Sequence, residues 1–169
     1  MKAYVGGIDY NDFQYDMVNG GRRQIGSTIK PFLYSLAMIE GFSPCDEMMH
    51  VQNTYFDENG IPWTPRNASA KRVGERVSIQ WGLQNSDNWV TAWLMSQMSP
   101  YTFVRLLHSF GLKNQMDPVI SICLGTPDVS VGEMVSGYTV FANKGIRAEP
   151  IYVTHIEDCL LYTSPSPRD

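Results

Sequence analysis

Two short polar motifs in this sequence carry residues that could do nucleophilic chemistry. In the first, Ser27 precedes Lys30 by three residues, with Gly26 before the serine and Pro31 after the lysine. A hydroxyl is a weak nucleophile until a base removes its proton, and a lysine can be that base only when its amine is neutral. Residues three apart on a helix share a face, so a helix that begins near Ser27 would bring the Lys30 amine within reach of the hydroxyl.

The position of Lys30 is unfavourable for a lysine with only a structural role. It would lie in the first turn of the helix, at the positive end of the macrodipole, where a cation is disfavoured. Arg22 and Arg23 add positive charge nearby. Burial and neighbouring cations lower the pKa of a lysine, so these features favour a neutral amine that can act as a base. The alternative for this pair is a helix cap at Ser27 followed by an exposed lysine.

The second motif is Ser86-Asp87-Asn88, which lies at a junction between two expected helices. Helix capping is the alternative explanation for Ser86 and Asn88, since both residue types are common caps. The order of the two motifs favours a shared catalytic role, because S-x-x-K followed by S-D-N is typical of enzymes with an acylated serine.

Helices are expected to position both motifs. The apolar spacing predicts helices from Ser27 to Gly41, after Ser78, over "NWVTAWLMSQM", after Ser99-Pro100, and after Ser130, which fits a capping box with Glu133. Strands are expected over "KAYVGGIDY" and over "EPIYVTHIED". Neither strand has an obvious partner nearby, and a lone strand leaves its backbone unpaired, so most of the sheet is expected to be missing.

The composition is that of a globular domain and excludes several classes of function. The 169 residues are 43% hydrophobic and carry a net charge of −4, which suits one domain with a core. The sequence has no basic run or basic-aromatic stripe, so nucleic acid is not an expected partner. Its apolar runs are far shorter than the roughly 20 residues that span a bilayer. The three cysteines and three histidines fit no zinc or C-x-x-C pattern, so we expect no metal.

Further segments extend the similarity to one protein family. "KAYVGG" precedes the serine, "GRRQIGSTIKPFLY" contains it, "WTPRN" lies between the motifs, and "LGTPDVSVGEMVSGYTVFANKGI" follows them. Together they resemble the transpeptidase domain of class A penicillin-binding proteins, the bifunctional peptidoglycan synthases, over residues 2 to about 158. The resemblance implies an α+β fold, the helical part of the serine β-lactamase and penicillin-binding protein transpeptidase fold, with most of the antiparallel sheet missing.

The resemblance also implies an activity, a serine D,D-transpeptidase, and a role for four residues. Ser27 would be the acylated nucleophile, Lys30 its general base, Ser86 a proton relay to the leaving amine, and Asn88 a hydrogen-bonding group for the substrate. The implied partners are the D-Ala-D-Ala end of a peptidoglycan stem peptide and β-lactams, and no metal or cofactor takes part. The implied location is the cell envelope, on the periplasmic or extracytoplasmic side of the membrane, with the N-terminal anchor outside this sequence.

The sequence departs from the family at its later part and at both ends. It contains no Lys-Thr-Gly or Lys-Ser-Gly, a motif that lies on a family strand forming part of the oxyanion hole, so we expect the chain alone to be inactive. Met1 is expected to lie inside a longer chain. The segment "CLLYTSPSPRD" resembles a translated sequencing adapter. The expected organisation is therefore a partial transpeptidase domain at 1–158 and a non-native tail at 159–169.

Two other functions are open on the sequence. A serine β-lactamase would need a base for deacylation, usually a glutamate followed closely by asparagine. Glu133 is the only glutamate between Ser86 and Phe141, and it is expected in a capping box. A β-lactam-sensing or peptidoglycan-binding module would share both motifs and acylate without turnover. The lifetime of the acyl-enzyme distinguishes the three functions, because a lactamase clears the adduct quickly and a sensor holds it without transpeptidation.

Overall fold

Helices dominate the chain, and its strands form two-stranded antiparallel pairs. The structure is a computed structural model that describes residues 3–9, 11, 14–68, 71–153, 156–157 and 163–164. The α-helices are α1 (Lys30–Ile39), α2 (Ile79–Gln84), α3 (Asn88–Ser96), α4 (Pro100–Ser109) and α5 (Val131–Ala142), and the 3-10 helices are η1 (Gly26–Ile29) and η2 (Ile120–Leu124). The strand pairs are β1 (Arg22–Gln24) with β6 (Asp128–Ser130), β2 (Glu47–Met49) with β5 (Arg76–Ser78), β3 (Tyr55–Phe56) with β4 (Pro62–Trp63), and β7 (Ile156–Glu157) with β8 (Thr163–Ser164).

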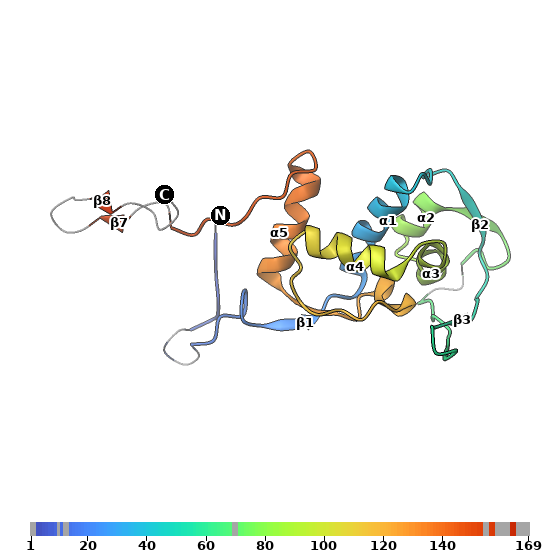
Figure 1. The fold of residues 1–169 in the computed structure, drawn as a ribbon, viewed down its shortest axis with the longest axis horizontal. Coiled ribbons are helices and arrows are strands. Elements are labelled where there is room, and N and C mark those ends of the chain that lie inside the picture. Colours follow the sequence, from blue (N-terminus) through green and yellow to red (C-terminus); the bar gives the residue numbers. More distant parts are fainter. Residues whose placement is uncertain are drawn as a thin grey trace.

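Helix α1 lies at the centre of the hydrophobic core. It packs against α2, α3, α4 and η2, and Figure 1 shows these helices gathered at one end of the molecule, with α5 beside them. Phe32, Leu33 and Ala37 of α1 are fully buried. A buried leucine or phenylalanine contributes about 1.5–3 kcal/mol relative to an exposed one, so this packing fixes the helix that begins at Lys30. No helix among the described residues is long and apolar enough to cross a membrane.

The helices that the sequence predicts are present, and two of the expected caps form, but the helix expected from Ser27 begins as the 3-10 helix η1, and neither η1 nor α1 has a side-chain cap. Ser78 caps α2 by accepting a hydrogen bond from the Trp81 N–H at 3.1 Å. The capping box of α5 is confirmed, because Ser130 and Glu133 each accept the backbone N–H of the other. Ser99 precedes α4 as expected but makes no side-chain cap bond. Helix formation therefore follows local signals that the sequence displays.

The predicted strands are mostly wrong. Among the described residues of "KAYVGGIDY", 3–9, none lies in a strand, and of "EPIYVTHIED" only Ile156–Glu157 does. The backbone of the front segment instead meets a turn, where Gly6 O accepts the Met17 N–H at 2.8 Å. A strand needs a neighbour to pair its backbone, and residues 3–9 pair with no strand. The tail expected at 159–169 lies largely outside the described residues, and its origin stays a prediction.

Strand β1 was not predicted, because its sequence Arg-Arg-Gln has no apolar alternation and its side chains are exposed. It forms through pairing with β6, with Arg23 opposite the buried Val129. Helix α5 adds a second tie between these distant segments, since the Tyr138 hydroxyl donates to Thr28 O at 2.6 Å. The chain on both sides of Ser27 is thus fixed by residues about a hundred positions later in the sequence.

A close contact between two glycines completes this support. The Gly26 N–H donates to Gly125 O at 3.1 Å, and Gly125 has a φ of +81°. A Cβ at position 125 would lie 2.0 Å from Gly26 O, closer than any real contact. Both the backbone conformation and the close approach therefore require glycine.

The Gly125 contact predicts a specific loss of stability. Gly125→Ala should lower the free energy of unfolding by about 3 kcal/mol, because the new methyl group meets strain in φ and a backbone clash. Gly145→Ala is the matched control, since Gly145 has a φ of +88° with nothing within 4 Å of its Cβ position. It should cost only about 1 kcal/mol. Equilibrium urea unfolding measures both, and equal losses would contradict the close approach.

Candidate active site

The two motifs meet at the side chain of Lys30. This lysine is only 1% exposed, although it lies at the start of α1. Its Nζ donates to Ser86 O at 2.6 Å, to Asn88 Oδ1 at 2.7 Å and to Ser86 Oγ at 3.2 Å. An ammonium has three donors, so three oxygens from the second motif satisfy it. The structure therefore brings Lys30, Ser86 and Asn88 together as the order of the motifs predicts.

The junction between α2 and α3 presents these oxygens. Ser86 has a φ of +51°, in the left-handed region that non-glycine residues rarely adopt. Asp87 follows as the N-cap of α3 and accepts the Val90 N–H at 2.9 Å. The tight turn directs the Ser86 carbonyl and the Asn88 side chain to the same point. Strained backbone of this kind often marks a functional site.

Burial changes the proton affinity of Lys30. Removal from water lowers the pKa of its amine to about 8, although the nearby Asp87 carboxylate and Cys123 thiol act in the opposite direction. A lysine with this pKa is partly neutral near physiological pH and can take or give a proton there. This agrees with the sequence argument that an unfavourable structural position gives a better base.

Ser27 lies one 3-10 turn before Lys30. Its side chain is exposed, and its carbonyl accepts the Lys30 backbone N–H. Residues three apart eclipse one another in 3-10 geometry, so the two lie on one side of η1. The oxygens that bind the Lys30 amine are those of Ser86 and Asn88, and no described hydrogen bond joins the amine to Ser27. The hydroxyl is thus accessible beside a lysine that the second motif orients.

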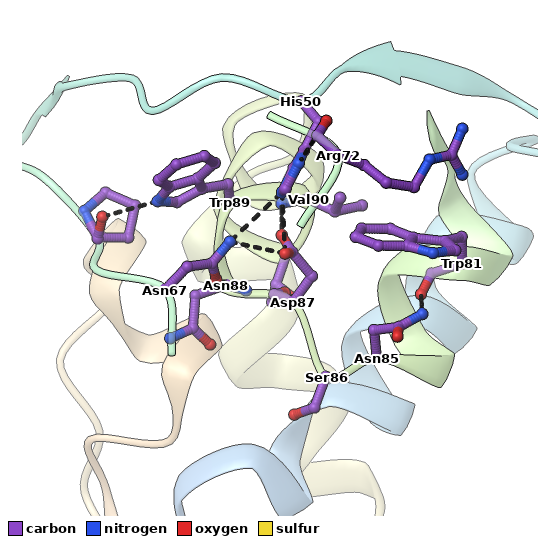
Figure 2. Close-up of polar contacts among 12 residues, drawn as sticks. His50, Asn67, Arg72, Trp81, Asn85, Ser86, Asp87, Asn88, Trp89 and Val90 are labelled. Atoms are coloured by element: carbon purple, nitrogen blue, oxygen red, sulfur yellow. Dashed lines mark hydrogen bonds and ion pairs between the residues drawn. The ribbon is translucent and has the colours of Figure 1, made fainter. Parts of the chain in front are cut away.

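A polar cluster behind the second motif was missed by sequence reasoning. His50 is fully buried, and its Nε2 lies 2.9 Å from Asp87 Oδ2 (Figure 2). Asn67 donates to the same carboxylate oxygen at 2.6 Å. In the sequence this histidine looks isolated, because positions 50 and 87 are too far apart to form a recognisable motif. The sequence contains one indication that Asn67 belongs to the site, because this residue ends "WTPRN", a segment that resembles the family.

The described residues contain no cluster of side chains that could hold a metal ion. No three His, Cys, Asp or Glu side chains among them gather closely enough to hold an ion. The histidine and aspartate of the cluster in Figure 2 are already bonded to each other and to neighbouring protein groups.

The fold and site define a class of protein. Helices that bring the lysine of an S-x-x-K motif against an S-D-N turn are typical of serine penicillin-binding proteins and serine β-lactamases. The family model for the penicillin-binding protein transpeptidase domain matches residues 3–169, and the chain belongs to this family.

Similar proteins agree with this assignment. The chain is 31% identical to penicillin-binding protein 2D of Bacillus subtilis, over 97% of this chain and 24% of that protein. It is also 31% identical to penicillin-binding protein 1A of Escherichia coli, over 92% of this chain and 18% of that protein. The chain thus spans a quarter or less of the length of these relatives. The resemblance to class A penicillin-binding proteins is confirmed.

Solved structures show the same fold. Penicillin-binding protein 1A of Haemophilus influenzae superposes with a TM-score of 0.87 at 25% identity, over 95% of this chain and 24% of that one. PonA1 of Mycobacterium tuberculosis, solved in complex with penicillin V, superposes with a TM-score of 0.76 at 22% identity, over 94% and 44%. The α+β fold class, with helices and only short antiparallel strand pairs, is thereby confirmed.

The charges around Lys30 make its titration a test of the geometry. Asp87→Asn should lower the pKa of Lys30 below about 8, because the Asp87 carboxylate is the largest of the influences that raise it. Asparagine is also a good N-cap, so α3 should keep its start. The side-chain carbon resonance of Lys30, followed by NMR as the pH rises, measures the shift. An unchanged or higher pKa in the variant would contradict the proximity of the two charges.

Proposed function

We propose that this chain carries the nucleophile, the base and the proton relay of a serine D,D-transpeptidase. The observation that supports the proposal most strongly is the buried Lys30, with its amine bonded to Ser86 and Asn88 and its pKa lowered by burial to about 8. The exposed Ser27 hydroxyl lies one turn away. An activated hydroxyl beside a base is the arrangement that acyl transfer requires.

In the proposed reaction, the Ser27 oxygen attacks the carbonyl carbon of the D-Ala-D-Ala peptide bond while neutral Lys30 takes the hydroxyl proton. The C–N bond of the tetrahedral intermediate then breaks, and the terminal D-Ala leaves with a proton that passes from the lysine through the Ser86 hydroxyl. The amine of a neighbouring stem peptide attacks the acyl carbon, the ester C–O bond to Ser27 breaks, and the amine proton passes through Lys30 to the Ser27 oxygen. Asn88 orients the lysine and hydrogen-bonds the bound peptide.

A β-lactam would follow the first half of this route. Its strained amide would acylate Ser27, but the cleaved nitrogen stays attached, so the adduct persists. We propose peptidoglycan stem peptides and β-lactams as partners of the complete protein. We place it at the extracytoplasmic side of the membrane. The 169 residues contain no Lys-Thr-Gly or Lys-Ser-Gly, so we expect little acylation by this chain alone.

The β-lactamase alternative is disfavoured by the position of Glu133. Although burial raises the pKa of this carboxyl, the N–H groups of Ser130 and Lys113 and the Arg22 guanidinium bring it below its usual value. The carboxylate is engaged in the capping box and in an ion pair of 2.9 Å with Arg22. It is therefore not free to activate a deacylating water. A β-lactam sensor stays the second candidate, because the described site would be acylated in the same way.

The nucleophile can be tested directly in the complete reading frame that contains this sequence. Ser27→Ala should abolish covalent labelling by a fluorescent penicillin, because no hydroxyl is left to acylate. Thr28→Ala, at the neighbouring exposed hydroxyl, is the matched control and should retain most labelling. Gel fluorescence with mass spectrometry of the labelled peptide measures both. Full labelling of the Ser27→Ala variant would refute the assignment.

The base predicts a pH dependence. Acylation needs a neutral Lys30, so its rate should rise with pH and level off above a pH of about 8, where the amine has lost its proton. Lys30→Arg should lose several orders of magnitude in rate at every pH, since a guanidinium stays protonated. Stopped-flow acylation between pH 6 and pH 10 measures this profile. A rate that is flat across this range would argue against lysine as the base.

A further inference from the structure

The segment Pro65–Asn67 binds the last two residues of the second motif and the residue that follows them. Pro65 O accepts the Trp89 indole N–H at 3.1 Å, and Arg66 O accepts the Asn88 side-chain amide at 2.7 Å. The Asn67 side chain bonds both Asp87 and the Asn88 backbone. Three consecutive residues of one segment thus hold three consecutive residues of the other. Figure 2 shows Asn67 beside Asp87 and Asn88.

The amide of Asn67 fits its two partners in one orientation. Its Oδ1 accepts the Asn88 backbone N–H at 2.7 Å, and its Nδ2 donates to Asp87 Oδ2 at 2.6 Å. A backbone N–H can only donate and a carboxylate can only accept, so a flipped amide would lose both bonds. Asn67 therefore fixes the backbone between Asp87 and Asn88.

The segment Pro65–Asn67 also determines which atom of the Asn88 side chain faces Lys30. Because Arg66 O is an acceptor, the nitrogen of the Asn88 side chain must point to it. The oxygen of that side chain is then left to accept the Lys30 amine at 2.7 Å. The hydrogen bond to Arg66 O therefore determines how the Asn88 amide is oriented toward Lys30.

His50 also contacts the oxygen of Asp87 that Asn67 binds. Its ring packs against Trp81 and Trp89, with centroid distances of 5.2 and 4.9 Å. Its Nδ1 lies 3.1 Å from Arg72 O and its Nε2 lies 2.9 Å from Asp87 Oδ2. Nε2 also lies 3.3 Å from Asn67 Nδ2, so the histidine, the amide and the Asp87 carboxylate form one buried polar cluster.

We propose that Asn67 is a positioning residue for acylation, which holds the Ser86-Asp87-Asn88 turn in the geometry that orients Lys30, with His50 as its support on Asp87. The inference rests on the proposed function for its effect on rate. The structural part stands on the contacts alone, because Asn67 is the group that satisfies the Asn88 N–H and shares the Asp87 carboxylate. Small misplacements of catalytic groups can cost about a hundredfold in rate.

The test compares Asn67→Ala with Asn143→Ala in the complete reading frame. Asn143 donates its side-chain amide to Ile146 O at 3.1 Å, so this control also loses one amide bond to a carbonyl, at the end of α5. Penicillin acylation is followed over a range of concentrations, which separates the acylation step from the preceding non-covalent binding. Asn67→Asp is a second variant of nearly the same volume, which keeps the acceptor for the Asn88 N–H and loses the donor to Asp87.

We expect the acylation step of Asn67→Ala and Asn67→Asp to slow by at least about tenfold, with non-covalent binding nearly unchanged. The Asn143→Ala variant should acylate like the wild type. A purely structural role for Asn67 would lower thermal stability and leave the acylation step of the folded protein unchanged. Acylation of both Asn67 variants at the rate of the Asn143→Ala control would overturn the proposal.

Hydrogen exchange separates this inference from the proposed function. In Asn67→Ala the Asn88 backbone amide should exchange at least about tenfold faster, because it has lost its acceptor. The Phe103 amide of α4, bonded to Ser99 O, serves as the internal reference. If the wild type is not acylated at Ser27, the proposed function is wrong, and the exchange rates alone test whether Asn67 positions the Ser86-Asp87-Asn88 turn. Unchanged exchange at Asn88 would then refute the positioning role.

Discussion

The burial of a lysine amine against three oxygens is the interaction on which the rest of the site depends. Lys30 could not stay in the core unless Ser86 and Asn88 supplied acceptors, because an unpaired buried cation is very costly. The acceptors in turn require a left-handed residue between two helices and a cap that starts the second one. Core packing of α1 and the polar turn at α3 are therefore coupled, because burial lowers the pKa of the amine while Asp87 of the turn raises it.

Local signals in the sequence predict the helices, whereas the meeting of the two motifs followed from their order and from the family resemblance. Ser78 and Ser130 act as caps where their types and spacing indicate, and the pKa of Lys30 is lowered, as its unusual position indicates. These features depend on residues within a few positions of one another, or on a resemblance that covers several segments in order. The α+β class followed from the same resemblance, which the family match and the solved structures support.

Non-local pairing could not be predicted from one sequence. Strand β1 has no strand-like pattern and exists because β6 lies beside it, while "KAYVGGIDY" has such a pattern and its described residues, 3–9, form no strand. The contact of His50 with Asp87 is of the same kind, since nothing in the sequence around either residue identifies the other. In both cases the structure depends on the approach of distant segments in space, which the secondary-structure propensity of single residues does not predict.

The approach of Gly125 to Gly26 has a consequence for how the chain acquires its chemistry. Contacts between segments about a hundred residues apart form late, because the entropy of closing a long loop must be overcome first. The turn that displays Ser27 is complete only after η2 and α5 have docked. A nascent or partly folded chain would therefore hold an ordinary serine and an ordinary, fully protonated lysine. Reactivity would then appear with the last folding step, so that acylation by a small electrophile reports the native population directly.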